Sequence, residues 1–156
     1  MPGFDYAALA EFRYQIRRFL RFSEEAARAA GVEPQQHQLL LAAKGAGGEP
    51  PTVRVLAERL QIQHHSAVEL IDRTARRGLV RRVRQSGDRR QVMVELTPKG
   101  EKTLRELTLH HREALSESAP ELVATLVRLV ASLAQTKHNA KFKIKNAKLK
   151  SKPSVA

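Results

Sequence analysis

Eight arginines and a single acid, Asp88, lie between positions 73 and 90 of this 156-residue chain. Guanidinium groups bind phosphates and the acceptor edge of guanine, so arginines at this density indicate a nucleic-acid partner. The alternative is a basic surface that only water solvates. We favour DNA binding, because an ordinary solvated loop or helix face carries fewer positive charges in so short a segment.

The residues just before these arginines have side chains that can contact bases. Residues 64–77 are predicted to form a helix, because apolar side chains recur at helical spacing and Gly78 follows them. Glutamine suits adenine, serine reaches bases or phosphates, and glutamate can accept from cytosine N4. The predicted DNA-binding residues are, in chain order, Gln63, His64, His65, Ser66, Glu69, Arg73, Arg76, Arg77, Arg84, Arg89 and Arg90.

Two neighbouring elements are expected to position this helix. Thr52 can cap a short helix over Val53–Leu60, and a turn over 61–63 joins that helix to the next. Beyond the second helix the apolar period changes to two, which predicts strands over 79–84 and 92–97. Two short helices followed by a hairpin form a winged helix-turn-helix. In it the second helix enters the major groove, and the hairpin reaches phosphates or the next minor groove.

Longer helices are predicted on both sides of this unit. Residues 5–30 have no internal interruption and carry apolar side chains at helical spacing, and Pro34 opens a second helix. After the hairpin, residues 98–117 and 120–133 are predicted to form two further helices, the second opened by a capping box at Ser118. The predicted fold class is mainly α with a small β-hairpin, a winged helix-turn-helix flanked by N- and C-terminal helices.

Four sequence segments form a pattern that is specific when they occur together. They are Leu56-Ala57-Glu58-Arg59-Leu60, Leu70-Ile71-Asp72-Arg73, Arg77-Gly78-Leu79-Val80-Arg81-Arg82, and Asp88-Arg89-Arg90 followed by Leu96-Thr97-Pro98-Lys99-Gly100. This pattern resembles the MarR (multiple antibiotic resistance regulator) family, over about residues 5–133. The resemblance implies a homodimeric transcription regulator that binds palindromic promoter sites and usually acts as a repressor.

The resemblance also implies a division of the chain. Residues 1–136 would form a single domain, in which 5–32 and 98–136 are dimerisation helices and 33–97 is the winged helix-turn-helix. The Lys-rich segment 137–156 would be a flexible tail, which is no feature of the family.

Individual residues receive roles from the same resemblance. Arg90 would be the wing's contact near the minor groove, and Asp72 would pair with Arg90 or a neighbouring arginine. A small aromatic or anionic effector would bind between the dimerisation and DNA-binding regions and release DNA. The chain departs from the family pattern at His37, where relatives usually have an aromatic residue, and at Glu69, which places an acid near the groove.

Metal binding is the alternative use of the histidines. A few MarR-like proteins sense metal through His and carboxylate ligands on the first, second and fifth helices. The corresponding residues here are Glu24 or Glu25, His37, Glu106, His110 and His111. Since ligands must converge in space and cysteine ligands are missing, unliganded histidines are the interpretation we favour, with no metal site.

Several classes are excluded or receive no support. The chain has no cysteine, so disulfides, thiol catalysis and zinc fingers are excluded. We find no phosphate-binding loop and no hydrolase motif, so we expect neither an enzyme nor a cofactor. No signal peptide is recognised and no apolar stretch approaches ~20 residues, so we expect a cytoplasmic protein without membrane contact.

The net charge of +12 is unevenly distributed. Seven lysines and no acid lie between Lys137 and Lys152, and the remainder of the chain contributes +5. A polybasic segment favours non-specific phosphate binding, so a non-specific architectural DNA-binding protein remains the alternative function. A winged-helix protein–protein adaptor without a DNA role is the third hypothesis.

Overall fold

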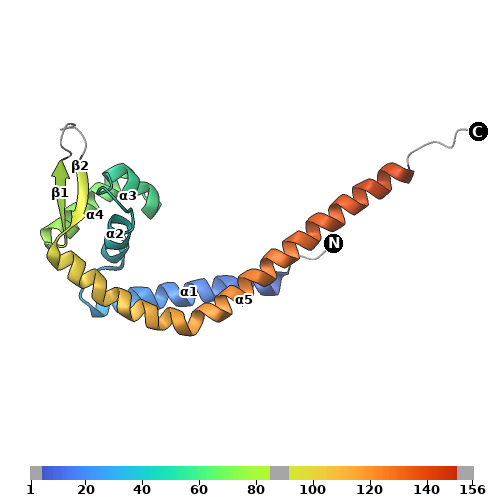
Figure 1. The fold of residues 1–156 in the computed structure, drawn as a ribbon, viewed down its shortest axis with the longest axis horizontal. Coiled ribbons are helices and arrows are strands. Elements are labelled where there is room, and N and C mark those ends of the chain that lie inside the picture. Colours follow the sequence, from blue (N-terminus) through green and yellow to red (C-terminus); the bar gives the residue numbers. More distant parts are fainter. Residues whose placement is uncertain (1–4, 85–91, 151–156) are drawn as a thin grey trace, which may run out of the picture. The chain divides into compact units, whose positions relative to one another are not determined.

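The computed structural model describes residues 5–84 and 92–150, and for 133–150 the backbone alone. In chain order its elements are α1 (Tyr6–Ala29), α2 (Pro34–Lys44), α3 (Val53–Leu60), α4 (His64–Arg76), β1 (Val80–Arg84), β2 (Val92–Leu96) and α5 (Pro98–Lys150) (Figure 1). The chain divides into two compact units, one over 21–114 and the other formed by 1–20 with 115–156. The predicted class, mainly helical with one β-hairpin, is confirmed.

The unit over 21–114 has a core to which α2, α3, α4 and the hairpin all contribute. The buried apolar side chains include Leu39, Leu40, Leu56, Ala67, Leu70, Ile71, Leu79, Val80 and Val94. Burying a side chain of the size of leucine or valine contributes about 1.5–3 kcal/mol, so these contacts dominate the stability of the unit. The faces predicted to turn inwards on α3 and α4 are the faces that the core buries.

Local signals set the ends of the two short helices. The Thr52 hydroxyl accepts a hydrogen bond from the Val55 amide at 3.4 Å, so the predicted N-cap of α3 is confirmed. Gln61 ends α3 in the left-handed region with φ 55°, and Gly78 follows α4 with φ 69°. A residue with a Cβ is strained in that conformation, which explains the glycine after α4.

The start of α5 is fixed against the end of α4. The Thr97 hydroxyl donates to the Gly78 carbonyl at 2.6 Å and accepts from the Gly100 amide at 3.1 Å. A Cβ on Gly100 would lie 1.9 Å from the Leu79 carbonyl oxygen, so only glycine permits this approach. The Leu-Thr-Pro-Lys-Gly segment therefore allows the first turn of α5 to pack closely against the backbone that leads into β1.

The hairpin is antiparallel, with Val80 opposite Leu96 and Arg82 opposite Val94. Its second strand does not alternate as predicted, because Met93 and Val94 are both buried. The reason is a further contact: Met93 forms an isolated bridge with Thr52, and the Val94 amide donates to the Pro51 carbonyl at 2.9 Å. The connection between the two predicted strands, residues 85–91, lies outside the described residues.

The prediction of two C-terminal helices is wrong. A single helix, α5, runs from Pro98 to Lys150 with Pro120 in its interior, so the capping box at Ser118 starts no new helix. A proline inside a helix costs about 3 kcal/mol, which packing against another helix can offset. In the unit formed by 1–20 and 115–156, Ala8 and Thr125 are buried.

The helix α5 also includes most of the lysine-rich segment. The backbone of 137–150 is helical. That residues 137–156 form a flexible tail stays a prediction. No helix among the described residues combines the length and the apolar character needed to cross a bilayer.

Candidate nucleic-acid interface

The outer face of α4 carries the polar residues predicted to contact DNA. Ala67, Leu70, Ile71 and Thr74 bury the opposite face in the core. The predicted contacts Gln63, His64, His65, Glu69, Arg73, Arg76 and Arg77 are exposed, and Ser66 is half-buried. One helix face is therefore anchored by apolar contacts while the other remains accessible, as insertion into a groove requires.

An ion pair connects α4 to the hairpin. The Asp72 carboxylate accepts from Arg82 Nη2 at 2.7 Å, and Arg82 lies on β1. The family resemblance implied Arg90 or a neighbouring arginine as the partner of Asp72, and the structure shows Arg82 in that role. Arg81, on the other face of the strand, pairs with Glu95 of β2. The Asp72–Arg82 pair links the hairpin to α4, and the Arg81–Glu95 pair links the two strands of the hairpin.

The C-terminal half of α4 is bound to the connection between α1 and α2. Arg77 donates from Nη1 to Gln36 Oε1 at 2.9 Å and from Nη2 to the Gly31 carbonyl. Arg73 lies 3.6 Å from the Glu33 carboxylate. Two of the arginines predicted to bind DNA therefore have internal partners, and Arg77 donates a hydrogen bond from each of its terminal nitrogens.

Of the four remaining predicted arginines, the structure describes two. Arg76 and Arg84 are exposed, and within 5–84 and 92–132 neither has an ion pair or side-chain hydrogen bond. Arg89 and Arg90 lie outside the described residues. Their roles stay predictions from the sequence.

A hollow of about 560 Å³ lies where the starts of α3 and α4 meet the hairpin. It is lined by Thr52, Val53, Arg54, Val55, His64, Val68, Arg82 and Val92. Arg54, an exposed side chain in the first turn of α3, was missed in the sequence analysis. Its position two residues after the predicted cap Thr52 was the available signal, since anions bind near helix N-termini.

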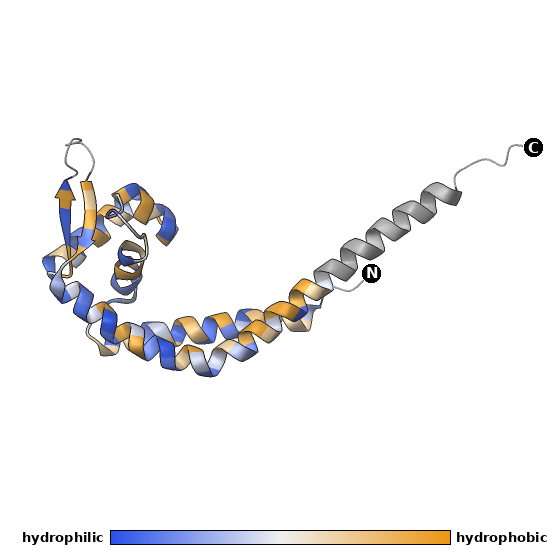
Figure 2. Ribbon diagram, viewed as in Figure 1, coloured by the Kyte–Doolittle hydropathy of each residue, from blue (hydrophilic) through white to orange (hydrophobic). Residues whose placement is uncertain are grey.

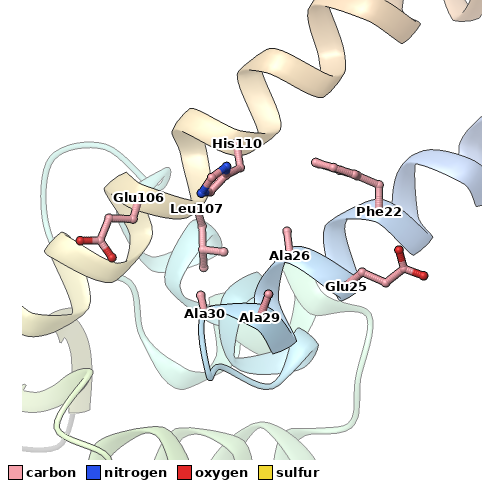
Figure 3. A pocket seen from close by; sticks show the side chains of 8 residues that line it. All are labelled: Phe22, Glu25, Ala26, Ala29, Ala30, Glu106, Leu107 and His110. Carbon is pink, nitrogen blue, oxygen red and sulfur yellow. The ribbon is translucent and has the colours of Figure 1, made fainter.

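A second pocket, of about 520 Å³, lies between α1 and α5 within the unit over 21–114. Figure 3 shows Phe22 and Ala26 of α1 on one side and Leu107 and His110 of α5 on the other. Ala29 and Ala30 complete an apolar floor, and Glu25 and Glu106 lie at the rim. The pocket suits a small molecule with an apolar body.

The candidate metal ligands do not converge. Glu25, Glu106 and His110 line this pocket, but the two carboxylates point away from one another (Figure 3). His37 and His111 instead form a buried pair, with ring centroids 4.8 Å apart. Among the described residues, no group of three or more histidines and acids is arranged to hold a metal ion.

The buried core, the exposed face of α4 and the adjoining hairpin define a winged helix-turn-helix protein. The family model that matches the chain, over residues 30–91, is that of the MarR family. Residues 30–91 therefore match the MarR family of DNA-binding transcription regulators, and the resemblance found in the sequence is confirmed.

Solved structures show the same fold across a larger part of the chain. AbsC, a MarR family transcriptional regulator from Streptomyces coelicolor, is 21% identical with a TM-score of 0.66, covering 85% of this chain and 93% of AbsC. A variant of MepR from S. aureus, bound to an oligodeoxyribonucleotide, is 20% identical with a TM-score of 0.61, covering 84% and 99%.

BpsR of Bordetella bronchiseptica, whose DNA binding is regulated by 6-hydroxynicotinic acid, is 19% identical with a TM-score of 0.60, covering 78% of this chain and 94% of BpsR. At these identities the likeness concerns the fold. Among curated proteins, none matches the chain.

Proposed function

We propose that this chain is a sequence-specific repressor that binds a palindromic promoter site as a homodimer. The observation that carries the proposal is α4, whose polar face is exposed while its apolar face is buried. Gln63, His65 and Glu69 would contact base edges, and Arg76, Arg84 and Arg54 would contact phosphates. Arg89 and Arg90 would complete the wing. We leave Arg77 out, because its guanidinium is bonded within the unit.

The proposal of a homodimer rests on apolar side chains that the single chain leaves exposed. They lie on α1 and α5 in the unit formed by 1–20 and 115–156 and include Tyr6, Leu9, Tyr14, Leu20, Leu115, Val123, Leu126, Val127 and Val130. Figure 2 shows hydrophobic residues along both helices. Exposed apolar residues in this number mark an interface, and a second copy would bury them.

A small aromatic compound is the effector we propose for the pocket between α1 and α5. The apolar floor and Phe22 suit an aromatic body. Glu25 and Glu106 at the rim disfavour an anion, so the aromatic alternative that the family resemblance implies fits the pocket better than the anionic one. A thermal-shift screen that includes aromatic cations and aromatic acids tests this, because a ligand of the folded state raises the melting temperature.

The test of sequence-specific binding compares two duplexes over a salt series. One duplex is selected from a random library with the full chain, and the other is its scrambled counterpart. A specific regulator binds the selected duplex at least ~10³-fold more tightly at physiological salt. Equal affinity for both duplexes at every salt concentration would instead support the non-specific architectural protein, and no binding to either would support a protein–protein adaptor.

A further inference from the structure

Two buried histidines lie where α2 packs against α1 and α5. His37 of α2 and His111 of α5 are buried, with 2% and 9% of their surfaces exposed. Their ring centroids lie 4.8 Å apart within the unit over 21–114. Relatives in the family usually have a non-titratable aromatic residue at this position, whereas His37 of this chain can take up a proton.

The two rings differ in how their nitrogens are satisfied. His111 Nδ1 lies 2.6 Å from the Leu107 carbonyl oxygen, and Nε2 lies 2.7 Å from the Ser23 hydroxyl oxygen. Since a carbonyl only accepts, Nδ1 carries the proton of the neutral ring and Nε2 accepts from Ser23. His37 Nε2 is buried without a hydrogen-bond partner. A neutral His37 fits this site, whereas a proton on its buried Nε2 would have no acceptor.

The surrounding charges offer no compensation for a proton on His37. On α1, Glu24 pairs with Arg28 and Glu25 with Arg21. On α5, the charged or titratable neighbours of His111 are Glu106, His110, Arg112 and Glu113, all exposed. At the two ends of α2, the N-cap residue Glu33 pairs with Arg73 and Lys44 pairs with Glu101. Arg77, directly after α4, bonds to Gln36, the residue next to His37. Burial lowers the pKa of His37 to about 4, and the charge of a protonated His111 acts in the same direction.

We propose that the His37–His111 pair is a proton-sensitive joint, and that acidification separates α2 from α1 and α5. The seated His37 resists protonation, whereas a released His37 takes up its proton at the ordinary midpoint for histidine. Between pH 7 and pH 5, the ratio of released to seated molecules therefore rises about 20-fold. The winged helix, of which α2 is a part, would then be held less firmly by the long helices.

The test measures the distance between α2 and α5 directly. The chain has no cysteine, so Gln38→Cys and Arg112→Cys, both exposed and adjacent to the pair, accept spin labels at defined positions. The labelled full chain, diluted with unlabelled chain, is examined by pulsed electron paramagnetic resonance at pH 7.5 and pH 5.0. We expect a longer-distance population to grow at pH 5.0. The proposal is overturned if the distance distribution does not change.

His37→Phe is the matched control, because it keeps an aromatic ring and removes the proton site. In this background we expect one distance population at both pH values; equal growth of the longer population would contradict the proposal. A titration of the native chain by imidazole carbon resonances gives a readout that needs no variant. His37 should titrate well below pH 6.5, and an ordinary midpoint would overturn the proposal. Both measurements are made without DNA, so a failure of this proposal can be distinguished from a failure of the proposed DNA binding.

Discussion

The helices α2 and α4 share one core, but α2 buries two large polar side chains while α4 keeps its charged ones at the surface. α4 turns its polar residues outwards, where Asp72 and Arg73 form ion pairs with Arg82 and Glu33. α2 buries Gln36 and His37, which are 1% and 2% exposed. The exposed polar groups of α4 can meet an external partner, whereas the buried Gln36 and His37 of α2 can act only on the packing of the domain. We therefore assign recognition of a partner to α4 and positioning of the domain to α2.

The two buried residues of α2 are themselves unequal. Gln36 Oε1 accepts from Arg77 at 2.9 Å and from the Glu33 amide at 3.2 Å, so its burial is compensated. His37 Nε2 has no such partner. A satisfied buried group stabilises one arrangement, while an unsatisfied titratable group makes that arrangement depend on pH.

The largest expected effect concerns His37 and acid. Its pKa is about 4 in the folded chain and 6.5 in the unfolded chain, so the unfolded state binds more protons between these values. The free energy of unfolding is therefore highest above pH 6.5 and falls by no more than about 3 kcal/mol as the pH drops to 4. Urea unfolding at pH 7.5, 5.5 and 4.5 measures this. His37→Phe should lose less stability over the same range, and parallel curves would contradict the assignment.

The second effect concerns the attachment of α4 to the α1–α2 connection. Arg77→Ala removes two hydrogen bonds from a charged donor and should lower the free energy of unfolding by about 2 kcal/mol. Arg76→Ala, one position earlier and without a described side-chain partner, should change it by about 0.5 kcal/mol or less. Equal losses in the two variants would show that Arg77 has no special role.

A smaller effect is expected for the ion pair between α4 and the hairpin. Asp72 and Arg82 are both partly exposed, with 55% and 38% of their side chains accessible. A double-mutant cycle with Asp72→Asn and Arg82→Ala should therefore give a coupling energy of about 0.5 kcal/mol in unfolding. A zero coupling energy would mean that the pair does not fix the hairpin.

The smallest expected effect on specificity comes from the lysine-rich segment. Deleting residues 137–156 removes seven positive charges and should reduce the salt dependence of DNA affinity. Because those charges contact phosphates alike in any duplex, selected and scrambled duplexes should lose affinity equally. Fluorescence anisotropy measures both affinities. If only the affinity for the selected duplex falls, the lysine-rich segment and not α4 recognises the sequence.

The sequence predicted the elements whose signals are local. Thr52 and Gly78 mark the ends of α3 and α4, and their bounds agree with prediction to within one residue. The single α5 was missed because the capping box at Ser118 is a local signal, whereas the packing that keeps the helix continuous across Pro120 is not.

The site was predicted less completely for the same reason. Arg77 was placed at phosphate, but its partner Gly31 is 46 positions away and no periodicity reveals that contact. The pairing of His37 with His111 is similarly distant in sequence. Asp72 was predicted to pair with Arg90 or a neighbouring arginine, whereas its partner in the structure is Arg82 of β1.

The most direct test of the central claim, that the outer face of α4 recognises DNA sequence, replaces that face. A variant with Gln63→Ala, His65→Ala and Glu69→Ala keeps every buried residue of α4. We predict that its affinity for the selected duplex falls at least ~100-fold towards that for the scrambled duplex, because base contacts are lost while phosphate contacts remain. If the triple variant keeps the full preference of the native chain for the selected duplex, α4 does not recognise the sequence and the account is wrong.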